Sequence, residues 1–237
     1  SNQKINKVLK NWTTSHKPVY NFSSPDMITH MLWVVDDQEV ITTINEAFSK
    51  IDNLYIADGH HRTASAVKIG FKRRQQNPEY TGDEEFNYFL SVLFPDDELK
   101  IMEYNRVVAD LNGLTKELLL AKISKRFDIK ICTSDTRFQP TQKHTFGMFL
   151  EGKWYRLKAK EGTFDSSNLV ERLDVSILQD NLLQPILGIQ DPRTDQRIDF
   201  IGGIRGLDEL EKRVSQDMKL GFSLHPATIS ELMEIAD

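Results

Sequence analysis

The residues best suited to chemistry lie in one short motif, "DGHHR", within the stretch "YIADGHHRTASAVKIG". Gly59 permits a sharp turn and a close approach of the backbone to a ligand. His60 and His61 can donate hydrogen bonds to phosphate oxygens, and Arg62 offers a planar fork of donors that matches them. Because the N–H groups at a helix N-terminus also attract anions, the motif predicts a phosphate-binding site.

Asp58 is the acidic member of this motif. A carboxylate beside a bound phosphate is repelled unless it holds a cation such as Mg²⁺ or accepts a proton from an attacking hydroxyl. Both roles belong to phosphoryl transfer. Two simpler interpretations stay open: Asp58 can cap the following helix, or it can form a structural ion pair with Arg62. Adjacent histidines rarely reach one metal ion, so a structural zinc site is not expected.

Other charged residues are weaker candidates. Arg106 and Glu103 lie in "EYNRVV", where Arg106 can reach an anion and Glu103 can act as a base, but a solvated strand end is the favoured interpretation of both. The segment "DPRTDQRIDFIGG" concentrates arginines and aspartates, which suit a salt-bridge network at least as well as a substrate site. The P-loop pattern GxxxxGK[ST] and the GxSxG elbow are absent from the sequence.

The elements around the motif predict a strand–helix–strand–loop–helix unit. Residues 30–35 form a short apolar run, and apolar residues recur at helical spacing over 40–51. Residues 53–57 predict a second strand, and residues 63–76 a helix that ends before Pro78. The motif therefore falls on the loop between the second strand and the second helix.

The rest of the chain mixes hairpins, helices and single strands. The elements expected in chain order are a hairpin turning at 95–98, a helix at 113–126, a strand at 127–132, a hairpin turning at Glu151-Gly152, a helix at 168–187 interrupted by Pro185, and a strand–helix–strand–helix tail. Thr228 and Glu231 form a capping box for the last helix. This order predicts an α+β, or mixed α/β, fold.

Composition limits the class of protein. A net charge of −5 lacks the basic excess typical of nucleic-acid binders. The single cysteine, Cys132, cannot form an internal disulfide, and no apolar run approaches the roughly 18 residues of a membrane span. A cytoplasmic location without a membrane partner is therefore expected, and the oligomeric state is left open. Ser1 and Asn2 are typical of a tag remnant, so a fragment of a longer protein is expected, with a soft domain boundary between 1–110 and 111–237.

Four ordered segments carry a resemblance to a known family. "YIADGHHRTASA", "EEFNYFLSVLFPDDELKIMEYNRVV", "RLDVSILQDNLLQPILGI" and "RTDQRIDFIGG" are similar to DUF1015, a bacterial and archaeal family without an established activity. Within it, the DGHHR turn resembles the signature of the ParB/sulfiredoxin-like fold, whose related members use such a loop to hold nucleotide phosphates. The resemblance implies a ParB/sulfiredoxin-like element in residues 1–110.

The members most similar in this motif are free-serine kinases, which phosphorylate L-serine with ADP or ATP and magnesium. The resemblance implies that Asp58 and His60 act in catalysis and that Asp58 serves Mg²⁺. It also implies that nucleotide phosphate is bound by Gly59, His60, His61, Arg62 and Thr63. The upstream glutamate that these kinases use has no counterpart that we can match here, and the loop lacks the catalytic cysteine of sulfiredoxins.

The leading hypothesis is a nucleotide-dependent small-molecule kinase that acts on L-serine or a similar hydroxyl metabolite. The alternative is a non-catalytic regulator that binds nucleotide or phosphate with the same loop. A ParB-like DNA-associated protein or nuclease is less favoured, because the net charge is acidic and no helix-turn-helix pattern is recognisable.

Overall fold

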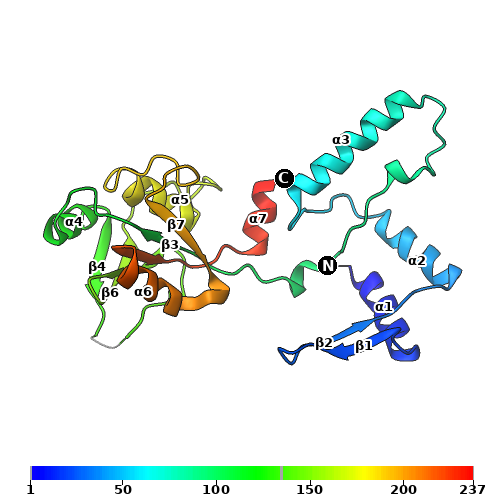
Figure 1. Cartoon of the computed structure of the whole chain (residues 1–237), viewed down its shortest axis with the longest axis horizontal. Coiled ribbons are helices and arrows are strands. Elements are labelled where there is room, and N and C mark those ends of the chain that lie inside the picture. Colours follow the sequence, from blue (N-terminus) through cyan, green and yellow to red (C-terminus); the bar gives the residue numbers. More distant parts are fainter. Residues whose placement is uncertain (1, 134–135, 237) are drawn as a thin grey trace. The chain divides into compact units, whose positions relative to one another are not determined.

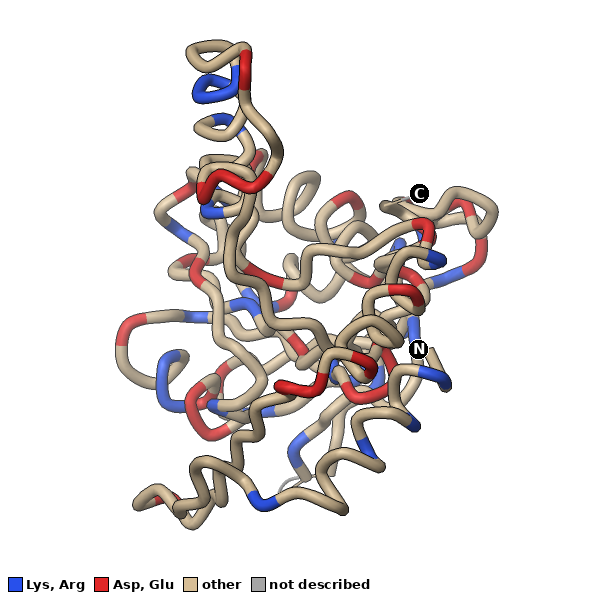
Figure 2. The backbone as a smooth tube through the Cα atoms, turned by 90° about the vertical axis from the view of Figure 1, so that its right-hand side faces the viewer, with Lys and Arg blue, Asp and Glu red and all other residues tan. Residues whose placement is uncertain are grey.

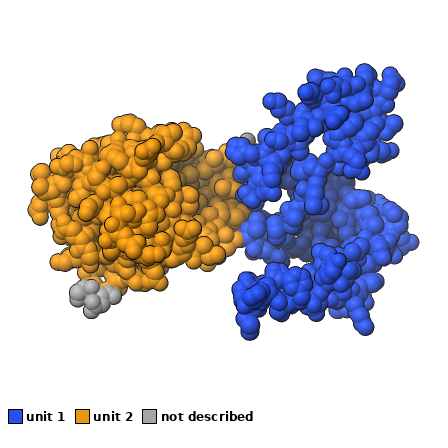
Figure 3. All heavy atoms as spheres, in the orientation of Figure 1, with its two compact units in different colours: residues 1–99 blue, residues 100–237 orange. Residues whose placement is uncertain are grey.

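The computed structural model describes residues 2–133 and 136–236. The chain divides into two compact units, residues 1–99 and residues 100–237 (Figure 3). Within the described residues there are seven α-helices, a six-stranded antiparallel sheet and a separate two-stranded hairpin (Figure 1). The predicted α+β class is confirmed. None of the described helices is long and apolar enough to cross a membrane.

The division between the units falls between Leu99 and Lys100, before the boundary expected at 110/111. The strand β3 (Tyr104–Val108) explains this position. It pairs with two strands from the C-terminal part of the chain and therefore belongs to the sheet of the second unit.

In the first unit, side-chain caps set where the first two helices begin. Its elements are α1 (Gln3–Ser15), β1 (Tyr20–Ser23), β2 (Thr29–Leu32), α2 (Gln38–Phe48), α3 (His60–Gln76) and two 3₁₀ turns, η1 (Glu85–Asn87) and η2 (Asp96–Glu98). The side chains of Asn2 and Asp37 accept hydrogen bonds from N–H groups of the first turns of α1 and α2. Trp12 of α1 is buried, and its Nε1 donates to the carbonyl of Val34 at 3.0 Å.

Two strand predictions for this part of the chain are wrong. Residues 53–57 do not form a strand, because none of the described strands provides a ladder partner for them. The hairpin predicted to turn at 95–98 is also absent from the described residues. Its second arm, β3, finds its partners elsewhere, and η2 occupies the turn. The strand expected at 30–35 is the short β2, which pairs antiparallel with β1.

The second unit is built on one sheet with the strand order β4-β6-β5-β8-β3-β7, antiparallel throughout. Besides β3, its elements are α4 (Lys116–Ile123), β4 (Phe127–Ile131), β5 (Thr145–Leu150), β6 (Lys153–Ala159), α5 (Asp174–Leu178), the π-turn η3 (Gln179–Leu183), β7 (Ile198–Gly202), the 3₁₀ turn η4 (Gly203–Arg205), α6 (Gly206–Gln216), β8 (Leu220–Ser223) and α7 (Ile229–Ala236). The predicted strand–helix–strand–helix tail is confirmed as β7, α6, β8 and α7.

Helical segments cover both faces of this sheet. Successive side chains of a strand point to opposite faces, so neighbouring residues pack in different clusters. Met148 packs in a large cluster with α4 and with segment 174–189. Its neighbour Phe149 packs in a smaller cluster with Leu210 of α6. The sheet is therefore the middle layer between helical segments, and its core residues alternate along each strand.

The hairpin of β5 and β6 follows its sequence signal. Leu150 lies opposite Lys153, so Glu151 and Gly152 form a two-residue loop. Both loop residues have positive φ, 47° and 72°, which is the geometry of a type I′ turn. The capping box is confirmed too, since the N–H of Thr228 donates to Glu231 and the N–H of Glu231 donates to the Thr228 hydroxyl.

The long helix predicted over 168–187 is only partly formed. The side chain of Asn168 accepts hydrogen bonds from the N–H groups of Val170 and Glu171, which favours turns before α5. After α5 the chain widens into η3, and the N–H of Gln184 donates to the carbonyl of Gln179 just before Pro185. Proline has no N–H to continue the helical ladder, so the helix ends there.

Charged residues of both signs alternate along the chain, as the interspersed blue and red segments in Figure 2 show. In the second unit several of them form ion pairs between elements, such as Lys116 with Glu151 at 2.8 Å. Such exposed pairs contribute little each, so apolar burial on the two faces of the sheet supplies most of the stability of this unit.

A substitution at Gly147 tests how closely the chain packs around β5. A Cβ at this position would lie 2.5 Å from the carbonyl oxygen of Phe138 and 2.9 Å from the ring of Trp154, and would overlap the hydroxyl of Ser223. We expect Gly147→Ala to lower the free energy of unfolding by about 1–3 kcal/mol or more, because the backbone must shift. Urea denaturation followed by circular dichroism measures the change.

Gly202→Ala is the matched control. Gly202 also lies in a strand of the sheet and has a negative φ, and its Cβ would meet nothing within 4 Å. Alanine there should leave the urea midpoint nearly unchanged. Equal losses in both variants would contradict the packing at Gly147.

Candidate functional site

The DGHHR motif forms the start of α3. Gly59 is the N-cap residue and adopts the left-handed conformation, with φ 81° and ψ 27°. The N–H of Thr63 donates to the carbonyl of Gly59 at 2.9 Å, which closes the first helical turn. No side chain of the described residues caps this helix, and its first turn holds no acidic residue. The N–H groups before Thr63 are thus available to an anion.

Arg62 turns back over this glycine. Its guanidinium donates from Nη2 to Oδ2 of Asp58 at 3.1 Å, and a Cβ at Gly59 would lie 3.1–3.3 Å from guanidinium atoms. The ion pair interpretation is therefore correct in geometry. The side chains of Arg62 and Asp58 are, however, 82% and 92% exposed. A pair this exposed stabilises the fold little, so Arg62 can exchange its partner for a ligand in solution.

Asp58 does not cap α3 with its side chain, which corrects the simplest interpretation of this residue. Nor do the described residues contain a group of three or more His, Cys, Asp or Glu side chains that could hold a metal ion. Mg²⁺ is usually held by one or two carboxylates together with phosphate oxygens and water. A single carboxylate next to a phosphate site fits that donor set.

Five of the predicted site residues follow Asp58 directly and share one turn: Gly59, His60, His61, Arg62 and Thr63. Of their groups, the N–H of Thr63 is already engaged in the helix, which leaves its hydroxyl for a ligand. His60, His61 and Arg62 are exposed on the surface of the first unit. The turn is thus an open basic surface, and a ligand would compete with water for its hydrogen-bonding groups.

Arg106 and Glu103 belong to the second unit and are engaged there. The guanidinium of Arg106 lies 4.4 Å from the ring centroid of Phe200 and 5.1 Å from that of Tyr104. Burial lowers its pKa to about 10. The carbonyl of Glu103 accepts the N–H of Gly203 at 2.7 Å. Arg106 thus packs on aromatic rings, and Glu103 anchors the end of β7.

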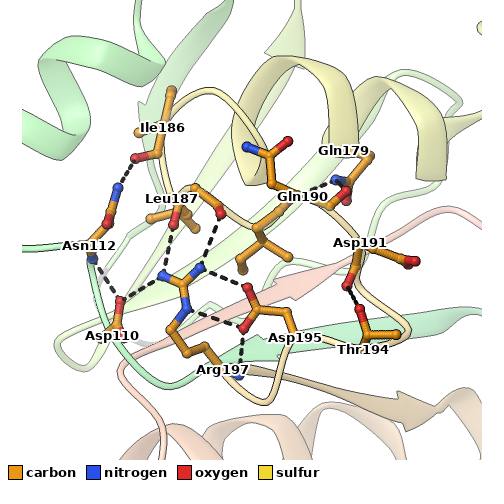
Figure 4. A network of polar contacts seen from close by, with 12 residues as sticks. Asp110, Asn112, Gln179, Ile186, Leu187, Gln190, Asp191, Thr194, Asp195 and Arg197 are labelled. Carbon is orange, nitrogen blue, oxygen red and sulfur yellow. Dashed lines mark hydrogen bonds and ion pairs between the residues drawn. The ribbon is translucent and has the colours of Figure 1, made fainter.

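The arginine- and aspartate-rich segment forms a closed network around Arg197 (Figure 4). Its guanidinium donates to the carbonyls of Leu187 and Gly188, at 3.0 and 3.2 Å, and to both carboxylate oxygens of Asp195. Asp110 adds an ion pair at 3.6 Å. With these donors satisfied, the network fastens the end of segment 174–189, as the structural interpretation expects.

A second polar cluster was not expected from the sequence. The side chain of Asp174, at the start of α5, is buried, and its Oδ1 accepts the N–H of His144 at 2.8 Å. Its Oδ2 is buried without a hydrogen-bond partner among the described residues. Burial raises the pKa of Asp174 to about 7, and the nearby Glu231 carboxylate adds to the rise.

Glu231 behaves in the opposite way. Burial by itself would raise its pKa, but hydrogen bonds from Lys143 and Thr228 outweigh burial and hold the pKa below its ordinary value. The Lys143 ammonium lies 2.5 Å from Glu231 Oε1. Lys143, Asp174 and Glu231 are far apart in the sequence, so no local spacing could have revealed the cluster.

The comparisons with known proteins give a family and one similar structure. The model of a family described as "Protein of unknown function (DUF1015)" matches residues 1–176. No curated protein matches the chain. A solved structure of a conserved hypothetical protein from Pyrococcus furiosus is 15% identical, with a TM-score of 0.37, and the match covers 79% of this chain and 66% of that one. The chain thus spans about two thirds of the length of that protein.

Arg197→Lys tests the closed network. A lysine cannot contact two carbonyls and two carboxylate oxygens at once, so we expect a loss of about 1–3 kcal/mol in the free energy of unfolding. Urea denaturation measures this loss, and amide hydrogen exchange should become faster mainly in segment 174–189. Arg193→Lys is the control, because Arg193 is 86% exposed and contacts only Asp191 among the described residues. A similar loss in both variants would argue against the network.

The pH dependence of unfolding tests the burial of Asp174. Its pKa is about 7 in the native state against an ordinary value of 3.8, so between these values the native state binds a proton that the unfolded state releases. The free energy of unfolding should therefore fall as pH rises from about 4 to 7, by an amount on the order of a few kcal/mol. Urea titrations at several pH values measure the slope.

Asp174→Asn should remove this downward component, since asparagine does not titrate. Asp180→Asn, an exposed position in the same segment, should retain the wild-type slope. Identical pH profiles for wild type and Asp174→Asn would show that Asp174 is not a buried acid.

Proposed function

The chain belongs to the DUF1015 family of proteins of unknown function, and we propose that it binds nucleotide phosphate at the turn Gly59–Arg62. One observation carries this proposal: a left-handed glycine begins a 17-residue helix whose first turn holds three successive basic side chains and no acidic one. The backbone N–H groups and the guanidinium supply hydrogen bonds, and the helix dipole adds a positive potential.

The finer proposal is a small-molecule kinase that uses ATP or ADP with Mg²⁺ and phosphorylates L-serine or a similar hydroxyl metabolite. The substrate hydroxyl oxygen attacks the terminal phosphorus of the nucleotide, and the bond to the bridging oxygen breaks with release of the shortened nucleotide. Asp58 accepts the hydroxyl proton, and His60 donates a hydrogen bond to the transferred group. In the alternative role, Asp58 would hold Mg²⁺, which would supply neutralising charge to the phosphates, and water would take the hydroxyl proton.

The Asp58–Arg62 ion pair supports a role for both residues in ligand binding. In the absence of phosphate the two side chains satisfy each other at 3.1 Å. A phosphate can take Arg62 by bidentate hydrogen bonds, which releases the Asp58 carboxylate for a cation or a proton. Because the pair is exposed, this exchange requires little free energy.

The alternative is a regulator that binds nucleotide without turnover. It is favoured by the exposure of Asp58, because a catalytic base is usually tuned by burial or by a fixed neighbour. Binding is common to both proposals, so it is tested first.

Calorimetric titration of ATP and ADP, each with Mg²⁺, into the wild-type chain measures binding. Arg62→Ala should weaken nucleotide affinity by at least about tenfold, because a charge-assisted bidentate contact is lost. Arg73→Ala is the matched control, since it removes the same charge near the C-terminal end of the same helix. Its affinity should equal that of the wild type.

Two results would overturn nucleotide binding at this turn: no saturable heat with either nucleotide, or equal affinity in Arg62→Ala and the wild type. Where binding holds, ³¹P NMR of mixtures with L-serine separates the two proposals. A kinase forms phosphoserine in the wild type and none in Asp58→Asn, which still binds nucleotide. Binding without any phosphoserine favours the regulator.

A further inference from the structure

A small pocket in the second unit lies beside the buried carboxyl of Asp174. Its volume is about 30 Å³, and its lining includes Lys143, Arg172, Asp174, His225 and Glu231. These residues come from the segment before β5, the start of α5, the segment after β8, and α7. The pocket is therefore formed by tertiary packing within the second unit, and the DGHHR turn contributes no residue to its lining.

The cationic side chains of the lining already have anionic partners. Lys143 pairs with Glu231 at 2.5 Å, and Arg172 pairs with Glu234 at 2.6 Å. Glu231 also accepts from the N–H and the hydroxyl of Thr228. These pairs fasten α7 beside the pocket and leave the charges of its rim balanced.

Asp174 is the exception in this balance. The residue is 8% exposed, and its Oδ2 has no partner within the part of the chain that the structure describes. A buried carboxylate with one unpartnered oxygen is costly, because the group has lost its hydration and gained only the single hydrogen bond from the His144 N–H. The group that would complete it is a hydrogen-bond donor, and a positively charged donor would also compensate the buried charge.

We propose that this pocket binds a primary ammonium group, with Asp174 as the carboxylate that receives it. The volume limits the size of the ligand: a pocket of about 30 Å³ holds a group of the size of a few atoms, such as an ammonium or a methylammonium head, whereas a bulky quaternary head is too large. Lys143 is exposed, so the rim of the pocket reaches solvent. The site belongs to the second unit, whereas the proposed nucleotide site belongs to the first, and neither proposal rests on the other.

The pH dependence of binding follows from the groups around Asp174. These are Lys143 and His144 before β5, Arg172 before α5, His225 after β8 and Glu231 on α7. Burial raises the pKa of Asp174 to about 7. A cation needs the ionised carboxylate, so ammonium affinity should rise between pH 6 and 8. An anionic ligand would need the protonated acid and would bind more weakly over the same interval.

Methylammonium chloride is the probe, titrated into the full chain at pH 6 and pH 8 and followed by NMR chemical shifts of backbone amides around 143–144 and 172–175. In the wild type we expect the chemical shifts to saturate, and we expect the affinity for methylammonium to be higher at pH 8 than at pH 6. Asp174→Asn keeps the shape of the side chain and should weaken binding by at least about tenfold. Asp180→Asn, exposed in the same segment, should bind as the wild type does. Circular dichroism verifies that both variants fold.

Tetramethylammonium and sodium acetate complete the test. The first is too large for the pocket and the second has the opposite charge, so neither should give saturable shifts there. The proposal is overturned if methylammonium gives no saturable shift in the wild type, if Asp174→Asn binds it equally well, or if acetate binds in its place with higher affinity at pH 6.

Discussion

The second unit depends on the packing of segment 174–189 against one face of the six-stranded sheet. Leu178, Leu182 and Ile189 of this segment are fully buried there, together with Phe146 and Phe222 of the sheet. An irregular segment can cover a sheet only if its backbone polar groups find partners, because burial removes them from water. The α-to-π transition supplies some of these partners, and side chains from neighbouring elements supply the rest.

The two ends of this segment are fastened in different ways. At its C-terminal end, Arg197 donates to two carbonyls and a carboxylate, and Asn112 donates to the carbonyl of Ile186. At its N-terminal end, Asp174 accepts the N–H of His144, and its other carboxylate oxygen has no partner among the described residues. A saturated network stabilises the fold, whereas an unsaturated buried group stores free energy that a ligand can recover. This difference distinguishes the structural network around Arg197 from the proposed ammonium site at Asp174.

The DGHHR turn follows a third physical pattern. Its charges are exposed, so holding them in place requires little free energy and they exchange partners readily. Its affinity for an anion would come from the backbone and the dipole of α3, which are fixed by the helix itself. The second unit thus places a buried acid in a small pocket, whereas the first presents basic groups to solvent.

The sequence by itself determined the features that depend on near neighbours. The α+β class, the hairpin turning at Glu151-Gly152 and the capping box of Thr228 and Glu231 were predicted, because each rests on patterns or hydrogen bonds within a few residues. The DGHHR motif was correctly placed next to a helix N-terminus, but the helix begins at His60 and not at Thr63, so most of the motif lies in its first turn and not on a loop. Its ligand stays a prediction.

Only the tertiary structure decided which segments pair and which charges are buried. β3 pairs with β7 and β8, so the hairpin expected around 95–98 does not form, and residues 53–57 remain without a ladder partner among the described strands. The burial of Asp174 depends on elements separated by tens of residues. Strand pairing and desolvation are set by non-local contacts, and apolar patterning shows that a segment can be buried without showing against what.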